Sequence, residues 1–352
     1  MHRPPCSPSP SLTAILLSAF ALLSGASAYS VEVNQAGLSF FQPLPEVAAA
    51  PENPVTEAKV ELGSKLFHDP RFSRSQSISC NSCHGLSNYG VDGTPNSKGH
   101  RDKRGDRNAP TVFNAALHLS QFWDGRAPTV EEQAKGPVLN PIEMAMPDAD
   151  HVVKVIKSIP DYPKLFAKAF PEAKDPVTYD NFGRAIGAFE RKLLTPARWD
   201  EFLRGQGSAL TDAEKHGFNK FTEAGCVTCH NGPAVGGALY QKLGLLKPWP
   251  GLKDEGRAKA TKNDAEKGFF KVPSLRNITK TGPYLHDGSV SDLPTMVRMM
   301  AEHQAGRKLS EADVKSIVTF LEALTGKLPE KLIAQPELPK SGPDTPKADA
   351  GE

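Results

Sequence analysis

Cysteine is scarce in this chain, which has five cysteines among its 352 residues. Four of them form two close pairs, Cys80 with Cys83 and Cys226 with Cys229, and the fifth is Cys6. Because Cys6 lies in a segment that we expect to be removed, the mature chain should have no thiol left for a disulfide. A fold held together by disulfides is therefore excluded.

The chain also has little net charge and no long apolar run beyond its N-terminal segment. Lysine and arginine number 42 against 40 aspartates and glutamates, a net charge of +2, so nothing favours a nucleic acid or an anionic membrane surface as a partner. Strict apolar–polar alternation is nearly absent, which disfavours an extensive β-sheet. Hydrophobic residues make up 39%, enough for buried cores, and the length predicts about two domains.

The N-terminal segment has the pattern of a secretory signal peptide. His2 and Arg3 give it a basic start, residues 12–23 are mostly apolar, and Ala26 and Ala28 fit a small-residue cleavage site. An uncleaved membrane anchor is the alternative, but the apolar run is too short to span a bilayer comfortably. We therefore expect residues 1–28 to be removed on export to the periplasm, and no membrane-spanning segment to remain.

Each cysteine pair is followed directly by a histidine. The two runs are Cys80-Asn81-Ser82-Cys83-His84 and Cys226-Val227-Thr228-Cys229-His230. This is the attachment signature of c-type haem, in which both thiols form thioethers to the porphyrin and the histidine ligates the iron. A zinc site or a redox-active dithiol is the alternative, but neither requires a histidine after the second cysteine. We expect two covalently bound c-type haems, ligated by His84 and His230.

Helical patterns repeat a similar order twice along the chain. One helix is expected from Thr56 to about Asp69, before the first signature, and another from the capping box Thr211–Glu214, before the second. A further capping box, Thr129–Glu132, starts a short helix that we expect to end at Gly136-Pro137. We therefore predict a mostly α-helical protein of two cytochrome c-like domains, each around one haem, with long loops.

The predicted divisions follow from these patterns. Residues 1–28 are the signal peptide, 29–195 the N-terminal haem domain with an extended arm, and 196–335 the C-terminal haem domain. Residues 336–352 form a tail rich in proline, lysine, aspartate and glycine. Because the tail lacks apolar periodicity, we expect it to be disordered.

The sixth ligand largely decides whether a c-type haem carries electrons or reacts with a substrate. In the second domain the candidates are Met296, Met299 and Met300, since methionine raises the potential of a haem and suits electron transfer. A methionine stripe is also ordinary core filling, so the choice stays open on these residues alone. In the first domain His100 stands out, because a histidine on a glycine-flanked loop could ligate the iron in one state and leave it in another.

Together these features resemble the bacterial di-haem cytochrome c peroxidases over roughly residues 45–330. Besides both haem signatures, the matching runs are Arg107-Asn108-Ala109-Pro110-Thr111, Phe122-Trp123-Asp124-Gly125-Arg126, Glu132 to Pro137, Asn140-Pro141-Ile142-Glu143-Met144, Phe189-Glu190-Arg191 and Tyr284 to Ser289. The resemblance implies an oxidoreductase that reduces hydrogen peroxide with electrons from a small cytochrome c or a cupredoxin. It also implies a homodimer.

By this resemblance the N-terminal haem is the low-potential site of peroxide reduction. His84 would be its proximal ligand and His100 its displaceable distal ligand. Gln133 and Glu143 would line the distal pocket, where a carboxylate can move a proton between the peroxide oxygens. Without the resemblance, a solvated helix residue and a surface carboxylate are the more ordinary interpretations of these two residues.

The C-terminal haem, by the same resemblance, is the high-potential centre that receives electrons. His230 and Met300 would ligate it, and Trp123 would lie between the two haems. The family also binds one calcium ion. Its ligands in this chain would be Asn108, Thr281 and Pro283, the last two through backbone carbonyls.

Two other functions remain open on the sequence. One is a di-haem electron carrier without substrate chemistry, although a carrier has no need of the polar pocket predicted around Gln133 and Glu143. The other is a related di-haem enzyme that modifies a protein substrate and carries tyrosine as the sixth ligand of its second haem. The nearest tyrosine here, Tyr284, lies in a different run from Met300.

Overall fold

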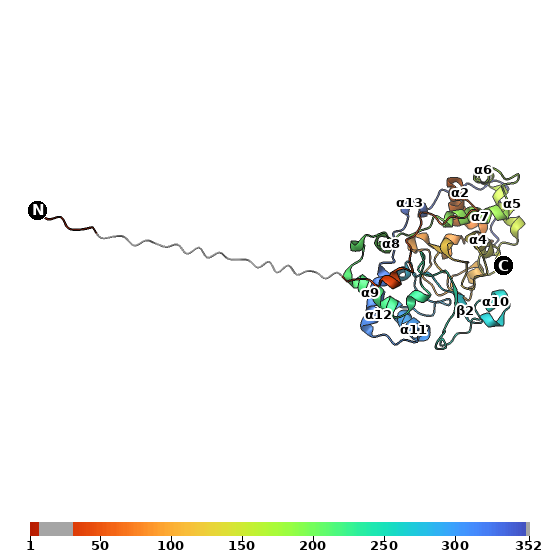
Figure 1. The fold of residues 1–352 in the computed structure, drawn as a ribbon. Coiled ribbons are helices and arrows are strands. Elements are labelled where there is room, and N and C mark those ends of the chain that lie inside the picture. Colours follow the sequence, from red (N-terminus) through yellow and green to blue (C-terminus); the bar gives the residue numbers. More distant parts are fainter. Residues whose placement is uncertain (7–30, 350–352) are drawn as a thin grey trace. The chain divides into compact units, whose positions relative to one another are not determined.

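The computed structural model describes residues 1–6 and 31–349. Most of the signal peptide predicted at residues 1–28 lies outside the described residues. From Val31 onward the chain forms one compact unit, and the description below concerns that unit (Figure 1).

Helices dominate the described part of the chain. In its first half they are α1 (Gln35–Leu38), α2 (Glu57–His68), α3 (Cys80–Cys83), α4 (Val130–Leu139), α5 (Ala149–Ser158), α6 (Tyr162–Ala169) and α7 (Tyr179–Glu190). In its second half they are α8 (Arg198–Leu203), α9 (Asp212–Glu223), α10 (Ala258–Thr261), α11 (Leu293–His303), α12 (Glu311–Glu322) and α13 (Glu330–Ile333). Two short strands, β1 (Tyr240–Lys242) and β2 (Phe269–Lys271), pair antiparallel. The predicted mostly helical fold is confirmed.

Side-chain caps start the helices that precede the two haem signatures. The Thr56 hydroxyl accepts a hydrogen bond from an amide in the first turn of α2. Thr211 and Glu214 form the predicted reciprocal capping box of α9. Gly225, with a φ of 85°, ends α9 and turns the chain into the second signature. The start of both helices is therefore encoded locally.

The end of α4 differs from the prediction. Thr129 caps its start as expected, but the helix continues through Pro137 to Leu139 instead of stopping at Gly136-Pro137. Proline removes only one backbone hydrogen bond at this position, which is close to the end of the helix. Val138, which is fully buried, packs the last turn into the core and favours the helical conformation there.

Two hydrophobic cores fill the unit, one in each half of the chain. The first is built by α2, α4, α5, α6 and α7, with Phe67, Phe182 and Phe189 buried at its centre. In the second, the buried indole of Trp199 has its ring centroid 5.2 Å from those of Phe218 and Phe320. Figure 1 shows the helices of the first core at one end of the unit and α9, α11 and α12 at the other.

The helix before each signature crosses a later helix of the same half at a glycine. A Cβ atom on Gly63 of α2 would lie 2.0 Å from the backbone oxygen of Ala185 in α7. A Cβ atom on Gly217 of α9 would lie 2.0 Å from the backbone oxygen of Ser316 in α12. Only a residue without a side chain permits backbones to approach this closely. A close helix crossing at a glycine therefore positions both haem signatures.

The ends of the described unit pack against the opposite halves. Phe41, in the arm assigned to the N-terminal domain, belongs to the second core, and the backbone amide of Asn34 bonds the side chain of Asn219 in α9 at 2.7 Å. Leu332 and Ile333 of α13 contact the first core. The N-terminal arm therefore packs against the second half and α13 against the first half, and both contacts join the two halves.

The tail also departs from expectation up to residue 349. Its residues lie outside helices and strands, but they form hydrogen bonds to the first half. The side-chain amide of Gln76 donates to the Pro346 carbonyl at 2.7 Å, and Arg74 pairs with Asp349 at 2.6 Å. Composition predicts disorder because the tail has few apolar groups to bury, but it does not reveal hydrogen-bonding partners on another segment.

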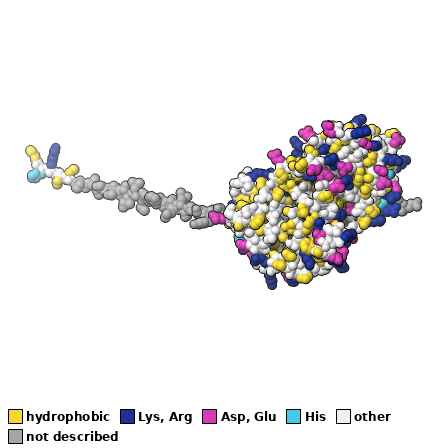
Figure 2. All heavy atoms as spheres, turned by 45° about the vertical axis from the view of Figure 1, so that its right-hand side comes forward, with side chains coloured by type: hydrophobic (Ala, Val, Ile, Leu, Met, Phe, Trp, Pro, Cys, Tyr) yellow, Lys and Arg dark blue, Asp and Glu magenta, His cyan; other side chains and the backbone are white. Residues whose placement is uncertain are grey.

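The surface carries both signs of charge. Figure 2 shows lysine and arginine interspersed with aspartate and glutamate on the face in view, as the near-zero net charge predicts. Among the described residues, no helix combines the length and the apolar character needed to cross a membrane.

We expect Gly63→Ala to destabilise the protein, although alanine is the better helix former. The added methyl group must push α2 away from α7, at a cost of about 1–3 kcal/mol in the free energy of unfolding, more than the gain in helix propensity. Gly207→Ala is the control, since a Cβ atom there meets nothing within 4 Å. Guanidinium denaturation of the holoprotein measures both. Equal stabilities for the two variants would contradict the proposed helix crossing.

Candidate functional site

Both haem signatures fold into a single tight turn. In each, the amide of the histidine donates to the carbonyl of the first cysteine, at 2.9 Å for His84 to Cys80 and 3.0 Å for His230 to Cys226. The first turn is α3, whose start is closed by a capping box between Ser79 and Ser82. This bond closes each signature into one turn, and in the first signature both thiols and the imidazole line the same cavity.

Burial suppresses ionisation in both signatures. It raises the pKa of the Cys80 thiol strongly and that of Cys226 to about 12, and it lowers the pKa of His84 and brings that of His230 to about 4. Redox-active dithiols need a depressed thiol pKa, so the dithiol alternative is disfavoured. Neutral imidazoles are the form that ligates a metal.

A cavity of about 190 Å³ surrounds the first signature. Cys80, Cys83 and His84 line it, and so do Gln133 of α4 and Glu143 of the following turn. The structure therefore brings Gln133 and Glu143 together with His84 in one cavity. A second pocket of about 300 Å³ adjoins this cavity and shares Glu143 with it.

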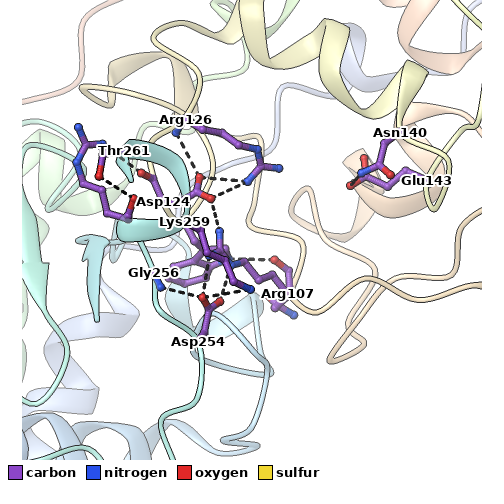
Figure 3. A network of polar contacts seen from close by, with 12 residues as sticks. Arg107, Asp124, Arg126, Asn140, Glu143, Asp254, Gly256, Lys259 and Thr261 are labelled. Atoms are coloured by element: carbon purple, nitrogen blue, oxygen red, sulfur yellow. Dashed lines mark hydrogen bonds and ion pairs between the residues drawn. The ribbon is translucent and has the colours of Figure 1, made fainter. Parts of the chain in front are cut away.

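Glu143 is half-buried at the junction of the two pockets. Asn140 donates to its carboxylate at 3.1 Å (Figure 3). Burial raises the pKa of Glu143, while the Arg126 guanidinium and the Asn140 bond partly offset this. A carboxylate with a raised pKa in this position can accept a proton and return it.

His100 is buried but does not line the cavity. Its backbone amide donates to the carbonyls of Ile142 and Glu143, at 2.9 and 2.8 Å, which fixes its loop to the distal turn. The charged groups nearest its ring are Arg101 and Arg74, and burial followed by these charges lowers its pKa. The structure thus holds His100 beside the distal turn and outside the cavity wall.

Trp123 connects the two halves. It lines the first cavity and also packs against the second hydrophobic core. Its indole nitrogen donates to the backbone carbonyl of Asn108 at 3.0 Å. The backbone amide of Asn108 donates to the His286 carbonyl at 2.7 Å. The segment of Asn108 is therefore joined to the loop that follows Thr281 and Pro283.

Comparison with known proteins identifies the family of this chain. A family model described as di-haem cytochrome c peroxidase matches residues 57–208. Cytochrome c551 peroxidase of Nitrosomonas europaea is 46% identical over 86% of this chain and 89% of its own length. The protein of the same name from Pseudomonas aeruginosa is 43% identical over 88% of this chain and 90% of its own.

This chain belongs to the di-haem cytochrome c peroxidase family. A solved structure of a MauG-like protein associated with microbial copper homeostasis also superposes, with a TM-score of 0.72 and 28% identity over 83% of this chain and 95% of that one. With two complete signatures, this family member binds two c-type haems.

The residues present fit those haems. Burial lowers the pKa of His84 and of His230, which favours the neutral imidazole that ligates iron, and the four signature cysteines are free thiols. Within the same residues no cluster of three or more His, Cys, Asp or Glu could hold a metal ion, which gives the zinc alternative no support.

Three methionines of this peroxidase family member are candidates for the sixth ligand of the second haem. Met296, Met299 and Met300 all lie on α11 and contact the second core, with Met296 the most buried. Which of them ligates the iron stays a prediction, and Met300 remains the residue that the resemblance favours.

Sequence reasoning missed several charged residues of the site. Glu190, at the end of α7, lines the cavity, and burial raises its pKa to about 8. Figure 3 shows a chain of ion pairs in which Arg107 bonds Asp124 at 2.6 Å and Asp254 at 2.7 Å, while Arg126 also pairs with Asp124. All of these residues except Asp254 lie in runs quoted above, so the available signal was a charged residue inside a specific motif.

Each signature should attach its own haem independently. We expect the double substitution of Cys80 and Cys83 by serine to lower the haem content from two to one per chain, because serine forms no thioether. The same substitution of Cys226 and Cys229 should remove the other haem. The pyridine haemochrome assay, referred to protein concentration, measures the ratio. Loss of both haems from one double variant, or of neither, would contradict independent attachment.

Proposed function

We propose that this protein is a periplasmic di-haem cytochrome c peroxidase that reduces hydrogen peroxide to water. The observation that carries the proposal is the placement of Glu143 and Gln133 in the wall of the cavity that contains the first signature. Membership of the family and the identity to two cytochrome c551 peroxidases support it. The physiological electron donor is then a small cytochrome c or a cupredoxin.

The two haems have different tasks in this proposal. Bound at the two signatures, they supply redox-active iron, at high potential in the C-terminal domain and at low potential in the N-terminal one. His230 and Met300 would hold the iron of the C-terminal haem and close it to substrate, and His84 would hold the iron of the N-terminal haem. Trp123 supports electron exchange between them, because it contacts both the first cavity and the second core.

Glu143 and Gln133 handle the substrate. Cleavage of the peroxide bond needs a proton to leave one oxygen and reach the other, and the Glu143 carboxylate accepts and returns it. The Gln133 amide donates a hydrogen bond to the peroxide without titrating. One peroxide, two electrons and two protons give two water molecules.

His100 controls access to the first iron in this scheme. The His100 imidazole would hold the iron of the N-terminal haem in the resting oxidised state, and its loop would act as a bistable element that responds to reduction of the C-terminal haem. Calcium, bound by Asn108 and the carbonyls of Thr281 and Pro283, stabilises the junction between the halves. A homodimer is the proposed assembly.

Replacing Glu143 by glutamine should lower kcat/KM for hydrogen peroxide by about 10²–10⁴-fold, because an amide cannot accept the proton. In the wild type, activity should fall as the pH drops through the raised pKa of Glu143, since protonation removes the base. Steady-state assays with a reduced small cytochrome across pH measure both effects, and the acid limb should vanish in the variant.

Glu132→Gln is the matched control for this experiment. Glu132 also lines the second pocket, the one of about 300 Å³ that shares Glu143 with the cavity. It pairs with Lys135, however, and does not line the cavity of the first signature. We expect near-normal turnover and an unchanged acid limb. A loss of activity equal to that of Glu143→Gln would argue against a specific proton transfer.

Substitution of His100 by glycine should make the fully oxidised enzyme react with peroxide without prior reduction. The physical reason is that the variant has no imidazole to close the iron. Stopped-flow spectroscopy of oxidised and half-reduced protein, with and without calcium, measures the peroxide reaction. If oxidised His100→Gly is no faster than oxidised wild type, the proposed gating by His100 is wrong.

The nature of the second haem separates this proposal from its rivals. A methionine-to-iron absorption band at the red edge of the visible spectrum, lost in Met300→Leu, should be present. Its absence in the wild type would favour the protein-modifying relative, and normal spectra without peroxide turnover would favour an electron carrier.

A further inference from the structure

Lys271 is a buried cation in the wall of the first haem cavity. It ends β2, a strand of the second half, and it lines the cavity together with the residues of the first signature. Only 6% of the residue is exposed. Its ammonium group donates to the Ser120 carbonyl at 2.9 Å and lies 3.1 Å from Nδ1 of His118. An ammonium group has three protons, so one donor remains available.

His118 lines the same cavity and is also incompletely bonded. When Lys271 is protonated its ammonium group can only donate, so Nδ1 of His118 then accepts and the neutral ring carries its proton on Nε2. Burial, followed by the charge of Lys271, holds the pKa of His118 well below its usual range, which agrees with a neutral ring. Nε2 is buried and has no hydrogen-bond partner among the described residues.

No carboxylate in the described part of the chain forms an ion pair with Lys271. The acidic group that acts on it electrostatically is Asp124. Both oxygens of Asp124 are already bonded, by Arg107 and Arg126, as Figure 3 shows. Burial therefore lowers the pKa of Lys271 to about 7. A buried cation without an anion is costly, and a second unsatisfied donor beside it adds to that cost.

We propose that Lys271 and Nε2 of His118 bind a propionate carboxylate of the haem attached at Cys80 and Cys83. A haem brings two carboxylates into the cavity, and a carboxylate is an acceptor that satisfies both donors at once. The inference rests on the presence of the first haem and does not depend on peroxide turnover.

This contact has an electrostatic consequence. A cation held against the propionate stabilises the reduced iron, which carries one more electron, and so raises the midpoint potential of the first haem. Because Lys271 belongs to β2, the second half of the chain would then set the potential of a haem attached to the first half.

Spectroelectrochemical titration of the intact di-haem protein tests the proposal. Lys271→Met should shift the midpoint potential of the first haem to a more negative value and leave that of the second haem in place. Lys271→Arg should keep most of the wild-type potential, since it retains a cation. Lys242→Met is the control, because Lys242 lies on the paired strand β1 and is exposed.

If Lys271→Met fails to accumulate with two haems, Lys271→Gln and His118→Gln replace it, since both keep a polar side chain of moderate size. We expect a clear negative shift for Lys271→Gln and a smaller one for His118→Gln. An unchanged potential of the first haem in a Lys271 variant with both haems bound would overturn the proposal. So would an equal shift of both haems, or a shift matched by Lys242→Met. Peroxide turnover, measured separately, distinguishes this result from a failure of the proposed function.

Discussion

One backbone hydrogen bond organises each half of this protein. The amide of the histidine bonds the carbonyl of the first cysteine in both signatures, which closes each of them into one tight turn. This turn is short and weak by itself, so it needs support from neighbouring structure. The support comes from the preceding helix in each half, α2 or α9, and from the glycine at which that helix crosses a later one. The position of each iron therefore depends on a backbone-to-backbone contact.

The first site is assembled from both halves of the chain. Its signature, Gln133 and Glu143 come from the first half, while Lys271 reaches its cavity from β2 in the second. Arg107 bonds Asp254 of the second half as well as Asp124 of the first. Burial alone would raise the pKa of Asp254, but the bonds from Arg107 outweigh it and hold that pKa at about 2. Together with the exchanged chain ends, these contacts join the two halves around the first site.

The cavity is a medium of low polarity, and this decides which groups are charged within it. Burial keeps the signature histidines neutral and the thiols protonated before attachment, and it raises the pKa of Glu143 and of Glu190. A carboxylate whose pKa is raised takes up and returns a proton more readily than one that stays ionised. The second pocket, of about 300 Å³, leaves Glu143 within reach of solvent. Glu190, in contrast, is buried.

The sequence alone determined the features that depend on neighbouring residues. The two signatures, the caps at Thr56 and Thr211, and the apolar periodicity are local, so the haem count, the helical class and the helix starts could be predicted. The positions of Gln133 and Glu143 came from a resemblance, and the structure adds that both line one cavity. Tertiary structure alone decided what depends on contacts between distant segments. These include the continuation of α4 past Pro137, the packing of Phe41 in the second core, the hydrogen bonds of the tail, and the position of Lys271 without a carboxylate. A local pattern carries no information on which distant group will lie opposite a side chain, and burial and charge compensation depend on that group.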